Sequence, residues 1–243
     1  MSIRRKALII GNSGDKNNPK EYLEGVKKDI DNYKHFLQSN YGGDWYDYEI
    51  VLSLDETKSQ VLNKITALKN EYNDFVFVLF SGHGSYSSSK KCRKLYIYDD
   101  YIYEDDLTNI AKKQITIFDT CAGIENDLVL ESAGLESRAS LNKFESSKNY
   151  RKIYEDDIGN CPNQQVVLYS SSISESSSDD SELGGYFAYS LLKVAKNNTQ
   201  NILNSKEAYH YAKIIVQKQT NNEQNPQCKC IKSDNILPFS LGN

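Results

Sequence analysis

The apolar residues of this chain fall into two recurring patterns. Short uninterrupted apolar runs are typical of strands that are buried on both faces of a sheet. The clearest run is Phe75–Phe80, which reads FVFVLF. Similar but less extended patterns predict further strands at Ala7–Ile10, Tyr48–Leu54, Ile115–Phe118 and Val166–Tyr169, and a short strand or hairpin arm at Leu95–Tyr98.

The second pattern has the period of a helix. Apolar residues recur at helical spacing between Tyr22 and Ser39, with charged residues between them, which predicts an amphipathic helix. Thr57 is a suitable N-cap for a second helix that buries Val61, Ile65 and Leu68. Further helices are predicted at Glu104–Ala111, Tyr186–Val194 and Lys206–Gln217.

Strands that alternate with helices in this way predict an α/β fold, in which helices cover both faces of a mostly parallel sheet. In such sheets the functional side chains gather at the carboxyl ends of the strands. The residues that follow each apolar run are therefore the first candidates for a site.

Composition and charge exclude some functions. The net charge is only −4 and no block of Lys or Arg stands out, so we expect no nucleic-acid partner. No apolar run reaches the roughly 18 residues of a membrane span, and the start of the chain lacks the long apolar region of a signal peptide. Five cysteines, an odd number, indicate reduced thiols and a cytoplasmic protein.

Two of the predicted strand ends carry residues that can do chemistry. Phe75–Phe80 runs into Ser-Gly-His-Gly, which places His83 between two glycines, and Ile115–Phe118 runs into Asp-Thr-Cys-Ala-Gly, which contains Cys121. If the two strands are neighbours, both side chains open into the same crevice. A thiolate is a nucleophile, and a nearby imidazole can take its proton and later protonate a leaving amine.

The glycine beside the histidine completes this interpretation. The backbone N–H groups of Gly84 and Cys121 are candidates to bind a developing oxyanion. The alternative is that His83 caps a strand end and Cys121 is a buried small apolar residue. Two glycine-containing motifs at the ends of consecutive strands favour the catalytic interpretation.

These motifs resemble those of the caspase and metacaspase group of cysteine peptidases. The segment Leu23-Glu-Gly-Val-Lys-Lys-Asp29 is similar to the Leu-x-Gly-x-x-x-Asp opening of the first helix in metacaspases and their bacterial relatives. The serine-rich stretch Leu168–Ser172, followed by Gly184–Leu192, resembles the start of the small-subunit portion. The resemblance covers about residues 5–220.

The resemblance implies the caspase–haemoglobinase fold, a three-layer α/β/α sandwich around a mostly parallel, six-stranded sheet. Residues 1–243 then form a single catalytic domain, with a large-subunit-like portion at 1–123, a linker at 124–163 and a small-subunit-like portion at 164–243. The Gln-Ala-Cys-x-Gly motif of animal caspases is absent, so cleavage after aspartate is not implied.

The resemblance also implies a substrate pocket. In metacaspases an acidic pocket takes Arg or Lys, and the positions carried over to this chain are Asp29, Ser81 and Asp119. A carboxylate in a partly dry pocket pairs with a guanidinium through charge-assisted bonds. We expect Ser170 and Ser171 to bind the substrate backbone. Alternatively, Asp29 is a solvated acid on its helix and Asp119 bonds the loop backbone.

Two regulatory features remain open. The polar linker contains several basic residues, so that a basic-specific peptidase can cut itself there; an uncut insertion is the alternative. The basic residues are Arg138, Lys143, Lys148, Arg151 and Lys152. We expect no cofactor and no metal, although the acids between Asp99 and Asp106 leave calcium activation open, without an EF-hand pattern.

Together these inferences predict a cysteine endopeptidase of the caspase or metacaspase type, synthesised as a zymogen. We expect it to cleave proteins or peptides after Arg or Lys, as a monomer or under an unknown activator. Two alternatives stay open: a catalytically silent caspase-like interaction module, and a thiol hydrolase of a small amine-bearing substrate. The pair Cys228 and Cys230 has no second pair to complete a zinc site, and we interpret both as free thiols.

Overall fold

A six-stranded sheet forms the centre of the molecule. The computed structural model describes residues 3–18, 21–121 and 148–242. The strand order is β12-β8-β7-β3-β1-β2, and every neighbouring pair is parallel except β12 with β8. The strands are β1 (Arg5–Asn12), β2 (Ile50–Leu54), β3 (Phe75–Gly82), β7 (Lys113–Asp119), β8 (Gln164–Tyr169) and β12 (Gln227–Lys229).

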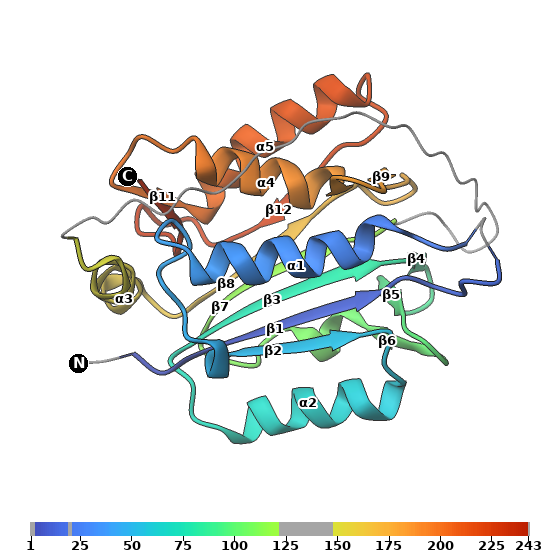
Figure 1. Cartoon of the computed structure of the whole chain (residues 1–243), viewed down its shortest axis with the longest axis horizontal. Helices are drawn as coiled ribbons and strands as arrows, with labels where there is room; N and C mark the ends of the chain where they lie inside the picture. Colours follow the sequence, from blue (N-terminus) through green and yellow to red (C-terminus); the bar gives the residue numbers. More distant parts are fainter. Residues whose placement is uncertain (1–2, 19–20, 122–147, 243) are drawn as a thin grey trace.

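Helices lie on both faces of this sheet (Figure 1). One face is covered by α1 (Gly25–Gln38), α4 (Tyr186–Lys196) and α5 (Ser205–Gln219), and α2 (Lys58–Asn70) covers part of the other. None of the helices in the described ranges is long and apolar enough to cross a membrane. Smaller strands complete the fold: β4 (Gly84–Ser87), β5 (Cys92–Tyr96) and β6 (Tyr101–Tyr103) form one sheet, β9 (Asp179–Asp180) pairs with β10 (Gly184–Gly185), and β11 (Ile202–Asn204) with β13 (Pro238–Leu241).

The sheet divides the interior into two cores. Along β3, Phe75, Phe77 and Leu79 point into the core beneath α1, α4 and α5, whereas the residues between them, Val76, Val78 and Phe80, point into the core beneath α2. All six are at most 1% exposed. Burial on both faces is the physical reason for the uninterrupted apolar run, and the predicted α/β sandwich is confirmed.

Some predicted elements have different bounds. The segment predicted as a strand from Tyr48 begins with a 3-10 turn, Asp47–Glu49, before β2. The helix expected at Glu104–Ala111 is only a single 3-10 turn, Glu104–Leu107. Thr57 caps α2 as predicted, since its side chain accepts a hydrogen bond from the Gln60 N–H.

The segment expected as a linker, residues 124–163, contains a helix. A helix, α3 (Tyr150–Asn160), occupies its C-terminal part, and the residues at Tyr150, Tyr154 and Ile158 form a buried stripe with a period of four. Arg151 on this helix pairs with Glu49 at 2.6 Å and with Glu155 at 2.9 Å. The linker boundaries stay a prediction, and residues 124–147 lie outside the described ranges.

Two substitutions on α3 test whether this segment is packed. Ile158 is fully buried and Ile153, on the same helix, is 37% exposed. We expect Ile158→Ala to lower the free energy of unfolding by about 2–5 kcal/mol, because it leaves a cavity in the core. Ile153→Ala is the matched control, with a change of roughly 0.5 kcal/mol or less. Urea denaturation measures both, and equal small losses would show that α3 does not support the core.

Candidate active site

The sheet brings His83 and Cys121 to the same edge. Strands β3 and β7 are neighbours, with Ser81 opposite Asp119, and His83 and Cys121 each follow two residues later. A Cβ atom built on Gly84 would lie 2.2 Å from Thr120 Oγ1 and 3.1 Å from the Cys121 carbonyl oxygen. Only glycine fits this approach, so the chain next to His83 packs directly against the chain next to Cys121.

His83 is oriented by a backbone carbonyl. Its Nε2 lies 2.5 Å from the carbonyl oxygen of Glu21. A carbonyl only accepts, so Nε2 carries the proton in this contact, and in the neutral ring Nδ1 is left as the acceptor. The sequence offered no acidic third partner, and a carbonyl fills that position.

Cys121 is held by Ser177. Its Sγ accepts a hydrogen bond from the Ser177 N–H at 3.2 Å and donates to the Ser177 carbonyl at 3.6 Å. Burial raises the pKa of the Cys121 thiol, and the nearby carboxylates of Asp119 and Asp179 raise it further. Among the described contacts no hydrogen bond joins the sulfur to His83, and the raised pKa favours the neutral thiol.

The three residues carried over as the acidic pocket do lie together. Ser81 Oγ donates to Asp29 Oδ2 at 2.6 Å, and Asp29 also accepts the Gly185 N–H at 3.1 Å. Asp119 accepts the Ala188 N–H at 2.7 Å and the Ser177 hydroxyl at 2.9 Å. Asp29 and Asp119 are only 1% and 4% exposed, so both are enclosed rather than solvated.

Two glycines make room for these carboxylates. A Cβ atom on Gly184 would lie 2.0 Å from Asp29 Oδ1, and one on Gly185 would lie 2.4 Å from Asp119 Oδ2. Gly184 also has a φ of +91°, which residues with a side chain rarely adopt. The Gly-Gly pair before α4 is therefore part of the acidic site.

Sequence reasoning missed Asp179 as a third acid. Its carboxylate accepts the Gly25 N–H at 3.2 Å. Burial raises the pKa of Asp179 to about 7, and the charges of Asp119 and Asp180 add to the effect. Burial and mutual repulsion also raise the pKa of Asp29. The acidic pair at 179–180 was visible in the sequence, but only the pairing of β9 with β10 places it above α1.

Sequence reasoning also missed Ser177. Ser170 and Ser171, which we expected to bind the substrate backbone, contact the Thr120 backbone instead. Both are fully buried. Ser170 Oγ accepts the Thr120 N–H at 3.0 Å and donates to the Thr120 carbonyl at 3.1 Å, and Ser171 Oγ reaches the same carbonyl at 3.4 Å. The two serines thus hold the Thr120 backbone, immediately before Cys121. Their role in substrate binding stays a prediction.

The described residues contain no group of three metal-ligating side chains. The acids considered for calcium make local contacts: Asp100 pairs with Lys58 at 2.8 Å, and Asp106 accepts the Tyr103 N–H at 2.9 Å. Calcium activation stays a prediction. Cys228 and Cys230 are free thiols in the structure.

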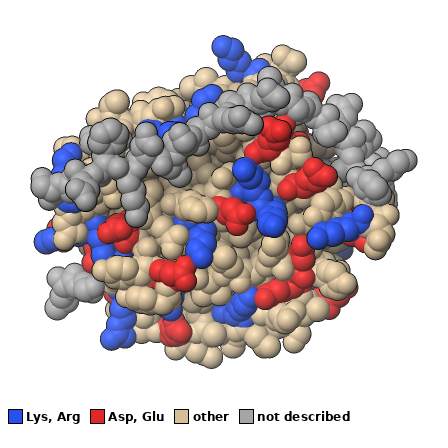
Figure 2. Space-filling view, in the orientation of Figure 1, with Lys and Arg blue, Asp and Glu red and all other residues tan. Residues whose placement is uncertain are grey.

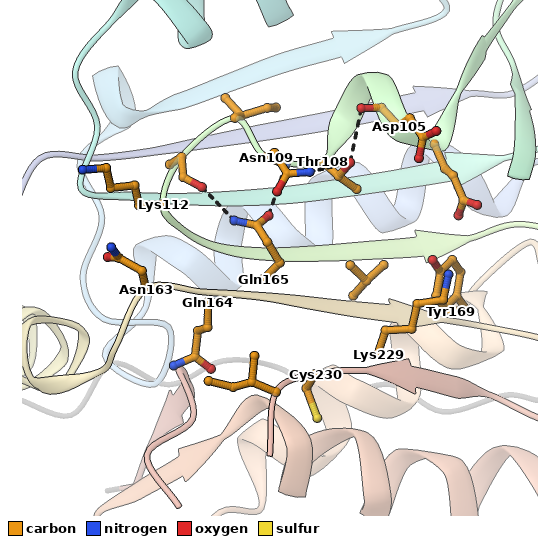
Figure 3. A pocket seen from close by; sticks show the side chains of 15 residues that line it. Asp105, Thr108, Asn109, Lys112, Asn163, Gln164, Gln165, Tyr169, Lys229 and Cys230 are labelled. Atoms are coloured by element: carbon orange, nitrogen blue, oxygen red, sulfur yellow. Dashed lines mark hydrogen bonds between the residues drawn. The ribbon is translucent and has the colours of Figure 1, made fainter. Parts of the chain in front are cut away.

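Other surface features lie apart from the site. A pocket of about 860 Å³ lies along β8 and β12, and Figure 3 shows it lined by Asn109, Gln165, Tyr169 and Lys229 among others. None of the predicted site residues lines it. Cations and anions are intermixed on the face shown in Figure 2.

The mostly parallel six-stranded sheet, with a histidine and a cysteine at neighbouring strand ends, is the arrangement expected of a caspase-type domain. The chain belongs to the family described as Caspase domain, whose model matches residues 4–236. The predicted family is thereby confirmed.

Two known proteins illustrate the likeness. Metacaspase-1B of Aspergillus niger is 27% identical over 186 residues, which cover 61% of this chain and 42% of that protein. The chain thus spans less than half of this relative. The crystal structure of caspase-1 from Spodoptera frugiperda matches with a TM-score of 0.64 over 93% of this chain and 88% of that chain. Its 12% identity shows the fold alone.

The raised pKa of Asp179 predicts a pH dependence of stability. The folded state binds this proton more tightly than the unfolded state, so the ionised carboxylate destabilises the fold as pH rises from about 4 to 7, with the full effect above pH 7. Asp179→Asn removes the charge and keeps an acceptor for the Gly25 N–H. We expect its gain in the free energy of unfolding to be larger at pH 8 than at pH 5 by roughly 2 kcal/mol.

Urea denaturation at the two pH values measures this difference. Glu182→Gln is the matched control, because Glu182 is an exposed carboxylate on the same hairpin. We expect it to behave alike at pH 5 and pH 8. If Asp179→Asn gained the same free energy of unfolding at pH 5 and pH 8, the raised pKa of Asp179 would be contradicted.

Proposed function

We propose that this chain is a cysteine endopeptidase that cleaves after Arg or Lys, with Cys121 as nucleophile and His83 as general base. The observation that carries the specificity is the acidic cluster beside the nucleophile, in which Asp29 and Asp119 are buried and Asp179 is half-buried. Among the described residues, the hydrogen-bond partners of these three carboxylates are hydroxyl and backbone N–H groups. A cationic substrate side chain would supply the missing positive charge.

The chemistry uses the two strand-end residues in turn. His83 takes the proton of the Cys121 thiol, and the thiolate attacks the carbonyl carbon of the scissile peptide bond. The N–H groups of Gly84 and Cys121 bind the oxyanion of the tetrahedral intermediate. Collapse of the intermediate breaks the C–N bond, and His83 protonates the leaving amine. Water, deprotonated by His83, then hydrolyses the thioester.

The acidic cluster suits a guanidinium better than a carboxylate. Arg presents several N–H donors in a plane and binds carboxylates in bidentate geometry. A pocket for aspartate would instead need cations at these positions. The Ser177 hydroxyl donates a hydrogen bond to Asp119. We infer that the substrate side chain replaces this hydroxyl.

The resting arrangement supports the expectation of a zymogen. Ser177 contacts both the Cys121 sulfur and Asp119, so this one residue blocks both groups from a substrate. We propose that the segment around Ser177 moves on activation. If the chain cuts itself, Arg138, Lys143 and Lys148 are better sites than Arg151, because Arg151 is held on α3 by Glu49 and Glu155.

A fluorogenic peptide panel tests the proposed activity. The panel varies the residue before the cleaved bond among Arg, Lys, Asp and citrulline, the neutral isostere of Arg, with and without Ca²⁺. We expect cleavage after Arg and Lys, and none by Cys121→Ala. Asp119→Asn should lower kcat/KM for the Arg peptide by roughly 10-fold or more. The same substitution should leave kcat/KM for the citrulline peptide nearly unchanged.

The outcomes separate the alternatives. Cleavage only after aspartate would keep the nucleophile and overturn the acidic pocket. Absence of cleavage under every condition, with Cys121 still labelled by a thiol probe, would favour the small-molecule hydrolase or a zymogen that lacks its activator. Absence of both would favour the silent interaction module.

A further inference from the structure

Arg93 is a buried cation behind the nucleophile loop. It lies on β5 and is only 4% exposed. Its Nη2 donates to the Ser171 carbonyl at 2.6 Å, and its guanidinium carbon lies 4.0 Å from the centre of the Tyr169 ring. Its own backbone N–H donates to Glu104 Oε1 at 3.1 Å.

Burial of this guanidinium is costly. A buried cation is stabilised only when close charges and hydrogen bonds replace its water. Burial lowers the pKa of Arg93, although the nearby Glu104 carboxylate favours its charged form, and within the described residues its Nε has no hydrogen-bond partner. By contrast, Arg151 at the far end of the sheet binds two carboxylates directly. An apolar side chain would fill the position of Arg93 at a lower desolvation cost, so packing alone does not explain it.

Two hydrogen bonds connect Arg93 to the residue before Cys121. Arg93 fixes the carbonyl of Ser171, and the hydroxyls of Ser171 and Ser170 both reach the Thr120 carbonyl. Ser170 Oγ also accepts the Thr120 N–H, so both polar groups of the Thr120 backbone are bound. Thr120 immediately precedes Cys121, whose N–H is a candidate oxyanion donor.

We propose that Arg93 is a positioning residue, which holds the Thr120–Cys121 backbone in its catalytic orientation through Ser171. This role rests on the proposed function, because Cys121 must be the nucleophile for its orientation to affect turnover. Arg93 touches neither the sulfur nor a substrate group; it acts through the chain of hydrogen bonds behind them.

The support extends to the molecular surface. Glu104 and Tyr169, two groups around Arg93, line the pocket of Figure 3. Lys229, which also lines it, has its Nζ 5.0 Å from the centre of the Tyr169 ring. The same ring therefore contacts a buried cation that supports the loop and a cation at the pocket.

Three variants test the role of Arg93. Arg93→Gln removes the charge, Arg93→Lys keeps one cationic donor for Ser171, and Arg151→Gln removes a paired arginine far from the site. We expect Arg93→Gln to lower kcat on an Arg peptide by about 10²-fold, the size of a small misplacement of reacting groups, and to change KM by less than about 3-fold. Arg93→Lys should recover at least a tenth of the lost turnover. Arg151→Gln should lower the melting temperature and keep kcat.

A second readout does not need peptidase activity. The alkylation rate of Cys121 by iodoacetamide, followed against pH by the mass of the peptide that contains Cys121, reports the environment of this thiol. We expect its midpoint to shift in Arg93→Gln and to stay in Arg151→Gln. If wild type shows no Cys121-dependent cleavage, the peptide assay bears only on the proposed function, and the alkylation midpoint still decides whether Arg93 positions the Cys121 backbone.

The proposal is overturned if folded Arg93→Gln keeps kcat within 2-fold of wild type and keeps the alkylation midpoint. If Arg93→Gln does not fold, Arg93→Lys decides: wild-type kcat and midpoint together with a lowered melting temperature would show a purely structural role. If Arg93→Lys recovers part of kcat and part of the wild-type alkylation midpoint, the positioning role is supported.

Discussion

The enclosure of like charges at one end of the sheet is the constraint on which the rest of the site depends. Asp29, Asp119 and Asp179 repel one another, and burial adds to the cost of ionising them. The chain offsets this cost with helix N-termini: the Gly25 N–H opens α1, and the Ala188 N–H lies in the first turn of α4. The path of α4, the two glycines before it and the hairpin of β9 and β10 all serve this arrangement.

Most of the central fold could be predicted from sequence because one physical signal determines it. Strands such as β3 are buried on both faces, and an unbroken apolar run has few other interpretations. The edge strand β12 gave no such signal, since its three residues, Gln227–Lys229, are polar or partly exposed. Helix α3 was missed because its buried stripe of two tyrosines and one isoleucine is interrupted by charged residues that make ion pairs.

The site divides in the same way. His83 and Cys121 could be found because the ends of parallel strands are fixed by the strands themselves. Asp29, Ser81 and Asp119 followed from the resemblance, and the structure brings them together. Ser177, Asp179 and Arg93 could not be found, because their positions depend on how a hairpin and a second small sheet fold back over the strand ends. Contacts of that kind leave no periodic trace in a sequence.

The origin of the three acids in the chain has a consequence for biosynthesis. Asp29 lies on the first helix, yet its N–H donor is Gly185, 156 residues further along. A contact of such separation carries a large loop-closure entropy and needs the intervening chain to be present. Asp29 therefore stays without this N–H donor until the chain has been synthesised at least as far as Gly185.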